Sequence, residues 1–176
     1  GGEDPWPTHR IYGEVREGQS LDQLGWEAGY SEVSGVHGRS QFQLHLEGFD
    51  PLNIVWPLPG KHNAANATAA AAMALRAGLS SEKLPELLAN FQGVSRRFEI
   101  RLDTAELTVI DDYAHHPSEV AGTIDAARLV YPNRKVTGVF QPHLYSRTQD
   151  FLADFAAALS KLDQCILLPI YAAREK

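Results

Sequence analysis

The spacing of apolar and polar residues is most informative from residue 41 onward. Phe42, Leu44 and Leu46 alternate with polar residues, which predicts a strand with one buried face. Turn-forming residues follow, and the apolar run at 52–58 predicts a returning strand. In the earlier part of the chain the periodicity is weak, and only 11–15 suggests a short strand. This part of the sequence therefore predicts a β-hairpin.

Helical composition begins abruptly after the hairpin. The alanine-rich segment 64–77 favours a helix, and Gly78 is suited to the left-handed residue that follows a helix end. A second helix is expected at about 82–90, with Ser80 or Ser81 as its N-cap. The hairpin and these two helices form the first predicted group of elements.

Strands and helices alternate in the second half of the chain. The pattern predicts strands at 107–110, 135–140 and 165–170, and helices at 117–130 and 148–162. Such alternation implies right-handed crossovers and a parallel sheet. A polar segment precedes it, so we expect a domain boundary there, with one domain at 1–97 and the next at 98–176. The predicted fold class is α/β, with a hairpin and helices followed by a partial Rossmann-like parallel sheet.

Composition excludes several classes of protein. The 176 residues carry a net charge of −6, from 16 basic and 22 acidic residues, which argues against broad nucleic-acid binding. No apolar run approaches the ~20 residues that span a bilayer, so membrane insertion is not expected. A single cysteine, Cys165, excludes an internal disulfide and favours a cytoplasmic setting; its apolar neighbours predict a buried thiol. The chain does not begin with Met, which suggests processing or a longer parent protein.

A glycine–lysine pair precedes the alanine-rich helix. Gly60 and Lys61 do not form a P-loop, because the earlier glycine and the following Ser or Thr are absent. Asn63 and Asn66 are three apart, hence on one helical face, where their amides suit the edge of a purine. On spacing alone a plainer alternative is favoured, in which Asn63 caps the helix and Asn66 is solvated.

Candidate catalytic side chains follow two of the predicted strands. After 107–110 come two carboxylates, a phenol and two imidazoles: Asp111, Asp112, Tyr113, His115 and His116. Ligands of open α/β sheets bind beyond the carboxyl ends of the strands, where this turn is expected. His143 and Arg147 follow the next strand and are expected at the same edge, converging with Asp112 on one crevice. Arg96 and Arg97 are candidate phosphate ligands, although paired surface arginines are common.

Five motifs together resemble the Mur ligases of bacterial cell-wall synthesis, and most strongly the branch that adds L-alanine. In order they are Gly-Lys-His-Asn-x-x-Asn, Gly-Val-x-Arg-Arg-Phe, Asp-Asp-Tyr-Ala-His-His-Pro, Phe-Gln-Pro-His-x-Tyr-Ser-Arg-Thr and Tyr-Ala-Ala-Arg-Glu. The resemblance covers about 58–175. It implies that the chain joins the end of a central ATPase domain to the start of a C-terminal ligase domain.

The resemblance also implies roles for individual residues. ATP would be bound by His62, Asn63, Asn66, Arg97 and Asp112. The amino-acid and acyl substrates would be bound by Tyr113, His115, His143 and Arg147, the last three being catalytic. The implied substrates are UDP-N-acetylmuramate and L-alanine, and the implied cofactors are ATP and Mg²⁺. The P-loop and the main magnesium ligands would lie outside this chain, which alone is expected to be inactive.

Three alternatives remain open. A sister ligase that recycles cell-wall peptides by attaching a whole tripeptide shares much of the pattern. A metal-dependent hydrolase would use the Asp/His cluster formed by Asp111, Asp112, His115, His116 and His143. These residues lack a fixed metal-binding spacing, and the nucleotide motifs would then be unexplained. A non-catalytic binding module is the third alternative.

Overall fold

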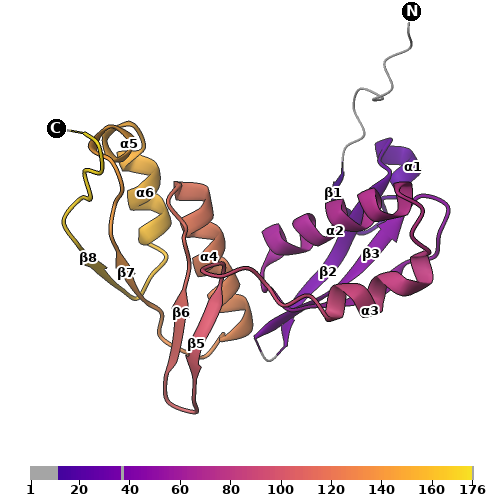
Figure 1. Cartoon of the computed structure of the whole chain (residues 1–176), viewed down its shortest axis with the longest axis horizontal. Helices are drawn as coiled ribbons and strands as arrows, with labels where there is room; N and C mark the ends of the chain where they lie inside the picture. The colour runs from indigo at the N-terminus through magenta and orange to yellow at the C-terminus, as the bar shows by residue number, and fades with distance from the viewer. Residues whose placement is uncertain (1–11, 37, 176) are drawn as a thin grey trace, which may run out of the picture. The chain divides into compact units, whose positions relative to one another are not determined.

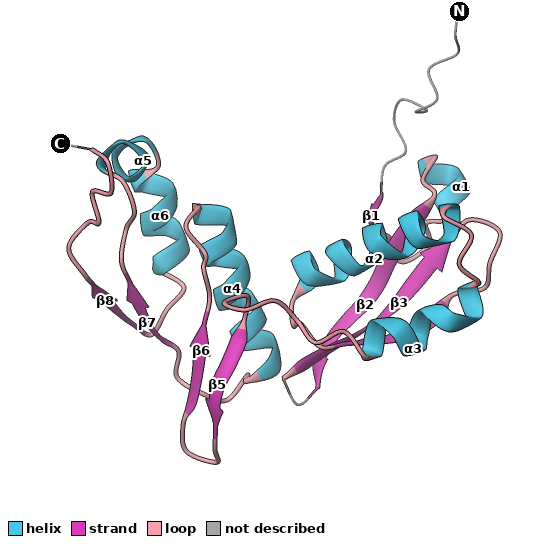
Figure 2. Cartoon of the chain, in the orientation of Figure 1, coloured by secondary structure: helices cyan, strands magenta, loops and turns pink. Residues whose placement is uncertain are grey.

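The computed structural model describes residues 12–36 and 38–175 as helices and strands in two units (Figures 1 and 2). The units are Gly1–Gln92 and Gly93–Lys176. The division falls shortly before the predicted domain boundary, because Arg96 and Arg97 contact Asp111 and Glu119 of the second unit. The assignment of 1–97 and 98–176 to two domains of a longer enzyme stays a prediction.

A four-stranded sheet forms the first unit, in the order β1-β2-β3-β4. Its strands are β1 (Tyr12–Glu14), β2 (Ala28–Val36), β3 (Arg39–Leu46) and β4 (Leu52–Trp56), and a short helix, α1 (Leu21–Leu24), precedes β2. β1 pairs with β2 in parallel, while the pairs β2–β3 and β3–β4 are antiparallel. The predicted hairpin is confirmed. Strand β2 was not predicted, because a register shift between Ser31 and Ser34 interrupts its alternation.

Two helices cover the buried face of this sheet: α2 (Lys61–Arg76) and α3 (Leu84–Ala89), the latter preceded by a 3₁₀ turn, η1 (Ser81–Lys83). Ala64, Ala67 and Ala71 of α2 are almost fully buried against the strands. Their small side chains let the helix backbone approach the sheet closely, which explains the alanine-rich sequence. The second predicted helix is confirmed as η1 and α3, but the side chain of Ser80 makes no capping hydrogen bond.

The end of α2 is the predicted glycine stop. Gly78 has a φ of 93° and donates its N–H to the carbonyl of Leu75 at 2.9 Å. Leu79 donates to the carbonyl of Ala74 at 3.0 Å, which completes a Schellman motif. A residue with a Cβ would be strained at this φ, so glycine is required here. The start of α2 lies at Lys61, ahead of the predicted start.

The second unit contains two separate two-stranded sheets with three helices. Its elements are β5 (Glu99–Asp103), β6 (Thr108–Asp111), α4 (Pro117–Val130), β7 (Thr137–Phe140), α5 (Tyr145–Asp150), α6 (Leu152–Leu159) and β8 (Gln164–Leu167). β5 and β6 are antiparallel, and β7 and β8 are parallel. The α/β class is confirmed, and α4 has the predicted bounds.

Three features of the second unit differ from the sequence prediction. β5 was missed because its residues are mostly polar and exposed. The helix predicted at 148–162 is divided at Phe151, which has φ −113° and ψ 24°. In the described ranges, no backbone ladder joins β6 to β7, so the parallel pairing is limited to β7 and β8.

Cys165 is exposed, which corrects the prediction of a buried thiol. It lies on β8, which is paired on one side only, and all four residues of that strand are exposed. An apolar run therefore indicates a strand here without indicating burial. Within the described residues no helix is both long and apolar enough to cross a membrane.

Candidate functional site

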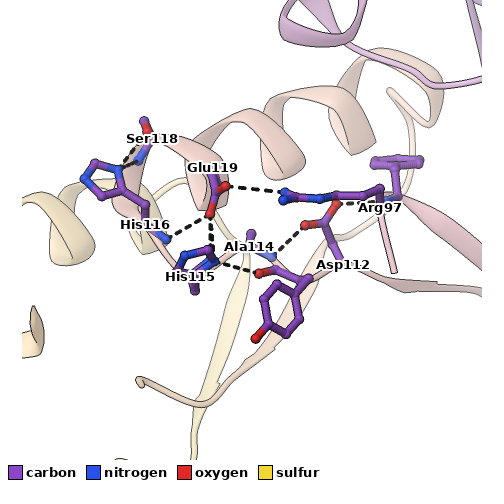
Figure 3. Close-up of polar contacts among 9 residues, drawn as sticks. Arg97, Asp112, Ala114, His115, His116, Ser118 and Glu119 are labelled. Carbon is purple, nitrogen blue, oxygen red and sulfur yellow. Dashed lines mark hydrogen bonds and ion pairs between the residues drawn. The ribbon is translucent and has the colours of Figure 1, made fainter. Parts of the chain in front are cut away.

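The turn between β6 and α4 is held by the carboxylate of Asp112 (Figure 3). Asp112 Oδ2 accepts a hydrogen bond from the backbone N–H of Phe98 at 2.8 Å, and its Oδ1 accepts one from the N–H of Ala114 at 2.8 Å. The backbone N–H of Tyr113 donates to the carbonyl of Arg96 at 2.7 Å. The Phe98–Asp112 and Tyr113–Arg96 bonds fix the turn against the segment that carries the two arginines, because each joins residues on opposite sides of β5 and β6.

Glu119 is the centre of a second set of contacts at the start of α4 (Figure 3). One carboxylate oxygen accepts the backbone N–H groups of His115 and His116, at 3.0 and 3.2 Å. The other oxygen lies 3.4 Å from Arg97 Nη1. Partial burial acts to raise the pKa of Glu119, but these hydrogen bonds and the nearby His115 outweigh it and lower the pKa. The carboxylate is therefore held in its ionised form.

Sequence reasoning did not identify Glu119. The available signal was its place as the third residue of α4, where a glutamate commonly bonds back to the N-cap backbone. The N-cap here is His116, which is outside the usual Ser, Thr, Asp and Asn. The resulting capping box is therefore atypical in sequence.

The two adjacent histidines have different surroundings. Nδ1 of His115 lies 3.1 Å from the carbonyl oxygen of Tyr113 and 3.1 Å from Glu119 Oε2. Nδ1 of His116 lies 2.8 Å from the hydroxyl of Ser118 and accepts that residue's backbone N–H at 3.4 Å. The His116 ring also packs against Phe151, with ring centroids 5.0 Å apart.

Tyr113 forms an exposed aromatic surface beside the turn. Its ring lies 4.9 Å from the guanidinium carbon of Arg96 and 5.5 Å from the His115 ring. A cation over an aromatic face is attracted by the ring quadrupole, so Arg96 is held here. The guanidinium also lies 3.5 Å from Asp111 Oδ2. Arg96 is therefore engaged with the turn, while Arg97 is directed toward Glu119.

His143 and Arg147 lie in the second predicted loop, which is tied to the end of the chain. His143 forms a β-bridge with Tyr171, and their rings are 5.4 Å apart. Glu175 accepts hydrogen bonds from the Ser146 hydroxyl and from the backbone N–H groups of Ser146 and Tyr145, and these bonds lower its pKa. Glu175 thus anchors the start of α5, which carries the half-buried Arg147.

The sequence predicts that Asp112, His143 and Arg147 converge on one crevice, but these three side chains are not joined by direct contacts in the described residues. Through residue 175, no described hydrogen bond or ion pair joins His143 or Arg147 to the Asp112 turn. The link between the two loops is instead the packing of His116 on Phe151, the residue between α5 and α6. The shared crevice stays a prediction.

A cavity of about 420 Å³ lies between β6 and β7, next to the Asp112 turn. Its walls include both strands and α4, with contributions from Ile110, Asp112, Val120, Ile124, Gly138 and Phe140. This cavity separates the two small sheets of the second unit. It runs along β6 from Thr108 to the Asp112 turn, and its lining is mixed, with Thr123, Arg134 and Lys135 beside the apolar residues.

On the first unit, the start of α2 contains three of the predicted nucleotide ligands. Asn63 is buried, and its Nδ2 donates to the carbonyl of Pro59 at 2.9 Å. Asn66 and His62 are exposed. The spacing thus places Asn63 and Asn66 on adjacent turns of α2, but only Asn66 presents its amide to solvent.

The residues of the alternative metal site are not gathered into one centre. In the described part of the chain, no group of three or more His, Cys, Asp or Glu side chains is placed to hold a metal ion. Both oxygens of Asp112 accept backbone amides, and the His143 ring lies against Tyr171. The structure therefore offers no support for the hydrolase alternative.

Residues 96–175 match the family model described as Mur ligase, glutamate ligase domain. The chain is 41% identical over 171 residues to a UDP-N-acetylmuramate–L-alanine ligase of Methylococcus capsulatus, which covers 95% of this chain and 34% of the relative. It is 51% identical over 138 residues to the enzyme of that name from Christiangramia forsetii, covering 78% and 30%. The chain thus spans about a third of the length of these relatives.

The fold is also similar to that of a solved ligase. A crystal structure of the UDP-N-acetylmuramate–alanine ligase from Thermotoga maritima matches with a TM-score of 0.71 and 31% identity. The match covers 82% of this chain and 32% of that one. Together with the sequence matches, this similarity extends over both units of the chain.

Proposed function

Because the chain belongs to the Mur ligase family through residues 96–175, we propose that it is part of an ATP-dependent ligase of peptidoglycan synthesis. The complete enzyme joins L-alanine to UDP-N-acetylmuramate through an acyl phosphate, and it works in the cytoplasm. The observation that carries this proposal is similarity, over 95% of the chain, to one L-alanine-adding ligase. It supports a ligase more strongly than any single motif does.

The first unit would contribute to recognition of the adenine of ATP. Asn66 presents a free donor and acceptor, which suit the paired edge groups of a purine. Asn63 uses one donor on the Pro59 carbonyl, which fixes the start of α2. Exposed His62 lies beside them at the same helix start. We therefore assign the main contacts with adenine to His62 and Asn66. The amide atoms of Asn63 that do not bond Pro59 would add a lesser contact.

The second unit would contact the phosphates and the ribose. Arg97 has an exposed guanidinium, and its one long contact with Glu119 leaves several N–H donors for phosphate oxygens. Each oxygen of Asp112 accepts one backbone amide and keeps a lone pair for a ribose hydroxyl. Phosphoryl transfer depends mainly on positioning and charge neutralisation, which are the tasks these residues can perform.

Magnesium would be held mainly by residues outside this chain. Mg²⁺ prefers oxygen ligands in a near-ideal octahedron. Within the described residues, no group of three or more His, Cys, Asp or Glu side chains is placed to hold a metal ion. Accordingly we assign no metal ligand to this chain.

The acid and amine substrates would be bound at the two loops of the second unit. Arg147 can hold the carboxylate of L-alanine in a bidentate pair. Tyr113 supplies an exposed phenol and ring face, and His143 an imidazole on the same loop as Arg147. His115 is the candidate base for the amine, since histidine exchanges protons near neutral pH.

Steady-state kinetics of the complete protein that contains this chain would test the proposal. ADP release should require both UDP-N-acetylmuramate and L-alanine. Arg147→Ala should raise the KM for L-alanine by about 10-fold or more, the effect of losing one charge-assisted pair, and leave the KM for ATP within about 2-fold. Arg16→Ala, which removes an exposed arginine of the first unit, is the matched control.

Other outcomes would identify the alternatives. ADP release that requires a tripeptide in place of L-alanine would show the recycling ligase. Metal-dependent hydrolysis without ATP would show the hydrolase. The 176-residue chain alone should release no phosphate from ATP above a blank, because it has no P-loop lysine.

A further inference from the structure

Glu119 stands out because its carboxylate contacts the backbone and ring of the candidate base as well as a candidate phosphate ligand. It accepts the His115 N–H at 3.0 Å, lies 3.1 Å from His115 Nδ1, and lies 3.4 Å from Arg97 Nη1. An ordinary helix cap requires only the backbone contacts. The contacts with two functional side chains are additional.

The atoms around each imidazole determine which nitrogen carries the proton. His115 Nδ1 faces a backbone carbonyl and an ionised carboxylate, and both can only accept a hydrogen bond. Both neighbours favour a proton on Nδ1 of His115. His116 Nδ1 faces the backbone N–H of Ser118, which can only donate, so this nitrogen must present its lone pair.

We infer that Glu119 is a positioning residue that holds the His115 ring in its Nδ1–H tautomer, with Nε2 free to take a proton. The neighbouring His116 has the opposite tautomer, with its proton on Nε2. The hydrogen-bond partner of one ring nitrogen generally decides whether the other nitrogen carries the proton. Here Glu119 and the Tyr113 carbonyl are that partner.

In the reaction proposed above, this arrangement has a defined use, and this step rests on the proposed function. His115 Nε2 takes one proton from the ammonium group of L-alanine. The freed nitrogen lone pair forms the bond to the acyl carbon, the carbon–oxygen bond to phosphate breaks, and phosphate leaves with those electrons. The second departing proton goes to phosphate or solvent. The imidazolium formed is stabilised by the Glu119 carboxylate next to Nδ1.

Long-range ¹⁵N–¹H NMR of the labelled 176-residue chain tests the tautomers directly. At a pH where both rings are neutral, His115 should show a protonated Nδ1 and His116 a protonated Nε2. Glu119→Ala should move His115 toward the Nε2–H form. Glu119→Gln, which keeps an oxygen acceptor, should retain more of the Nδ1–H form. Glu86→Gln, on α3 in the first unit, is the matched control and should change neither ring.

The results separate this inference from the proposed function. A protonated Nε2 on His115 in the unaltered chain, or an unchanged His115 in a folded Glu119→Ala variant, would overturn the inference. In the complete enzyme, Glu119→Gln should lower kcat by about 10-fold while the KM for ATP changes less than about 2-fold. If the complete protein has no ligase activity, the proposed function is wrong. The NMR spectra still decide the two tautomers independently. Equal losses in kcat and nucleotide binding would instead show a merely structural role for Glu119.

Discussion

The starts of α2 and α4 both carry polar motifs, but they use them differently. At α2, the hydroxyl of Ser40 accepts the N–H of Gly60 at 2.9 Å, and Asn63 donates to the Pro59 carbonyl; Ser40 and Asn63 are buried. At α4, the carboxylates of Asp112 and Glu119 are half-buried, and each accepts several donors. The first region uses neutral side chains inside the core, and the second uses charged ones at the surface.

The physical reason for the difference is the cost of burying charge. A neutral amide or hydroxyl can be buried when it is hydrogen-bonded, whereas an ionised carboxylate requires several donors or solvent. Asp112 and Glu119 meet this requirement with backbone N–H groups and Arg97 while staying accessible. Charged groups that remain accessible can also meet a ligand, which is why we locate the chemistry at α4.

The largest effect is expected when Asp112 is replaced by alanine. Two backbone N–H groups would lose an ionised acceptor, and the second unit should lose about 2–4 kcal/mol of stability. Hydrogen exchange followed by mass spectrometry on peptides from 93–176 measures this loss. Asp154→Ala, an exposed position on α6, is the control. Equal losses in both variants would contradict the structural role of Asp112.

Replacing Asn63 by alanine tests the buried motif of α2. The Pro59 carbonyl would lose its donor, which should cost the first unit about 1–3 kcal/mol. Every tryptophan of the chain lies within 1–92, so fluorescence during denaturant unfolding reports on this unit. Asn66→Ala should change stability by less than about 0.5 kcal/mol, since Asn66 is exposed. A larger loss at Asn66 than at Asn63 would reverse the comparison.

Acidification should weaken the α4 region selectively. The pKa of Glu119 is lowered in the folded protein, so its contribution is complete above the ordinary glutamate pKa and is lost as pH falls through the lowered value. Hydrogen exchange at the amides of His115 and His116 should therefore increase below about pH 4.5 relative to α2 amides. In Glu119→Gln this extra increase should disappear, and its persistence would assign the effect to another group.

A small effect is expected at the exposed ion pair that joins α2 to β1. Lys61 Nζ lies 2.6 Å from Glu14 Oε1, with 62% and 38% of the two side chains exposed. Solvent screens such a pair, so Lys61→Ala should cost less than about 1 kcal/mol in tryptophan-monitored unfolding. High salt should shrink the difference further. A loss as large as that of Asn63→Ala would show that surface charge, rather than buried hydrogen bonding, holds the start of α2.

The sequence by itself determined the elements whose signals are local. Pro117 at the first helical position and the apolar periodicity after it gave α4 its observed bounds, and Gly78 marked the end of α2. Alternation within 41–46 identified β3 and its hairpin with β4. These features depend on backbone dihedral preferences and on one buried face, and both leave a trace in neighbouring residues. The motif of the turn after β6 was also identified from sequence, because its residues are consecutive in the chain.

Only the tertiary structure decided which of those motif residues act together. Asp112 meets the backbone of Phe98, Glu119 meets Arg97, and Glu175 meets Ser146, all across intervening strands or helices. β5 and β2 became strands through pairing with the next strand in the chain, β6 and β3, although their own residues lack clean alternation. A carboxylate in the sequence shows that hydrogen-bond donors are required, but it does not show which residues supply those donors. Folding brings the donor and acceptor together, and so it is the fold that sets the charge and the tautomer at this site.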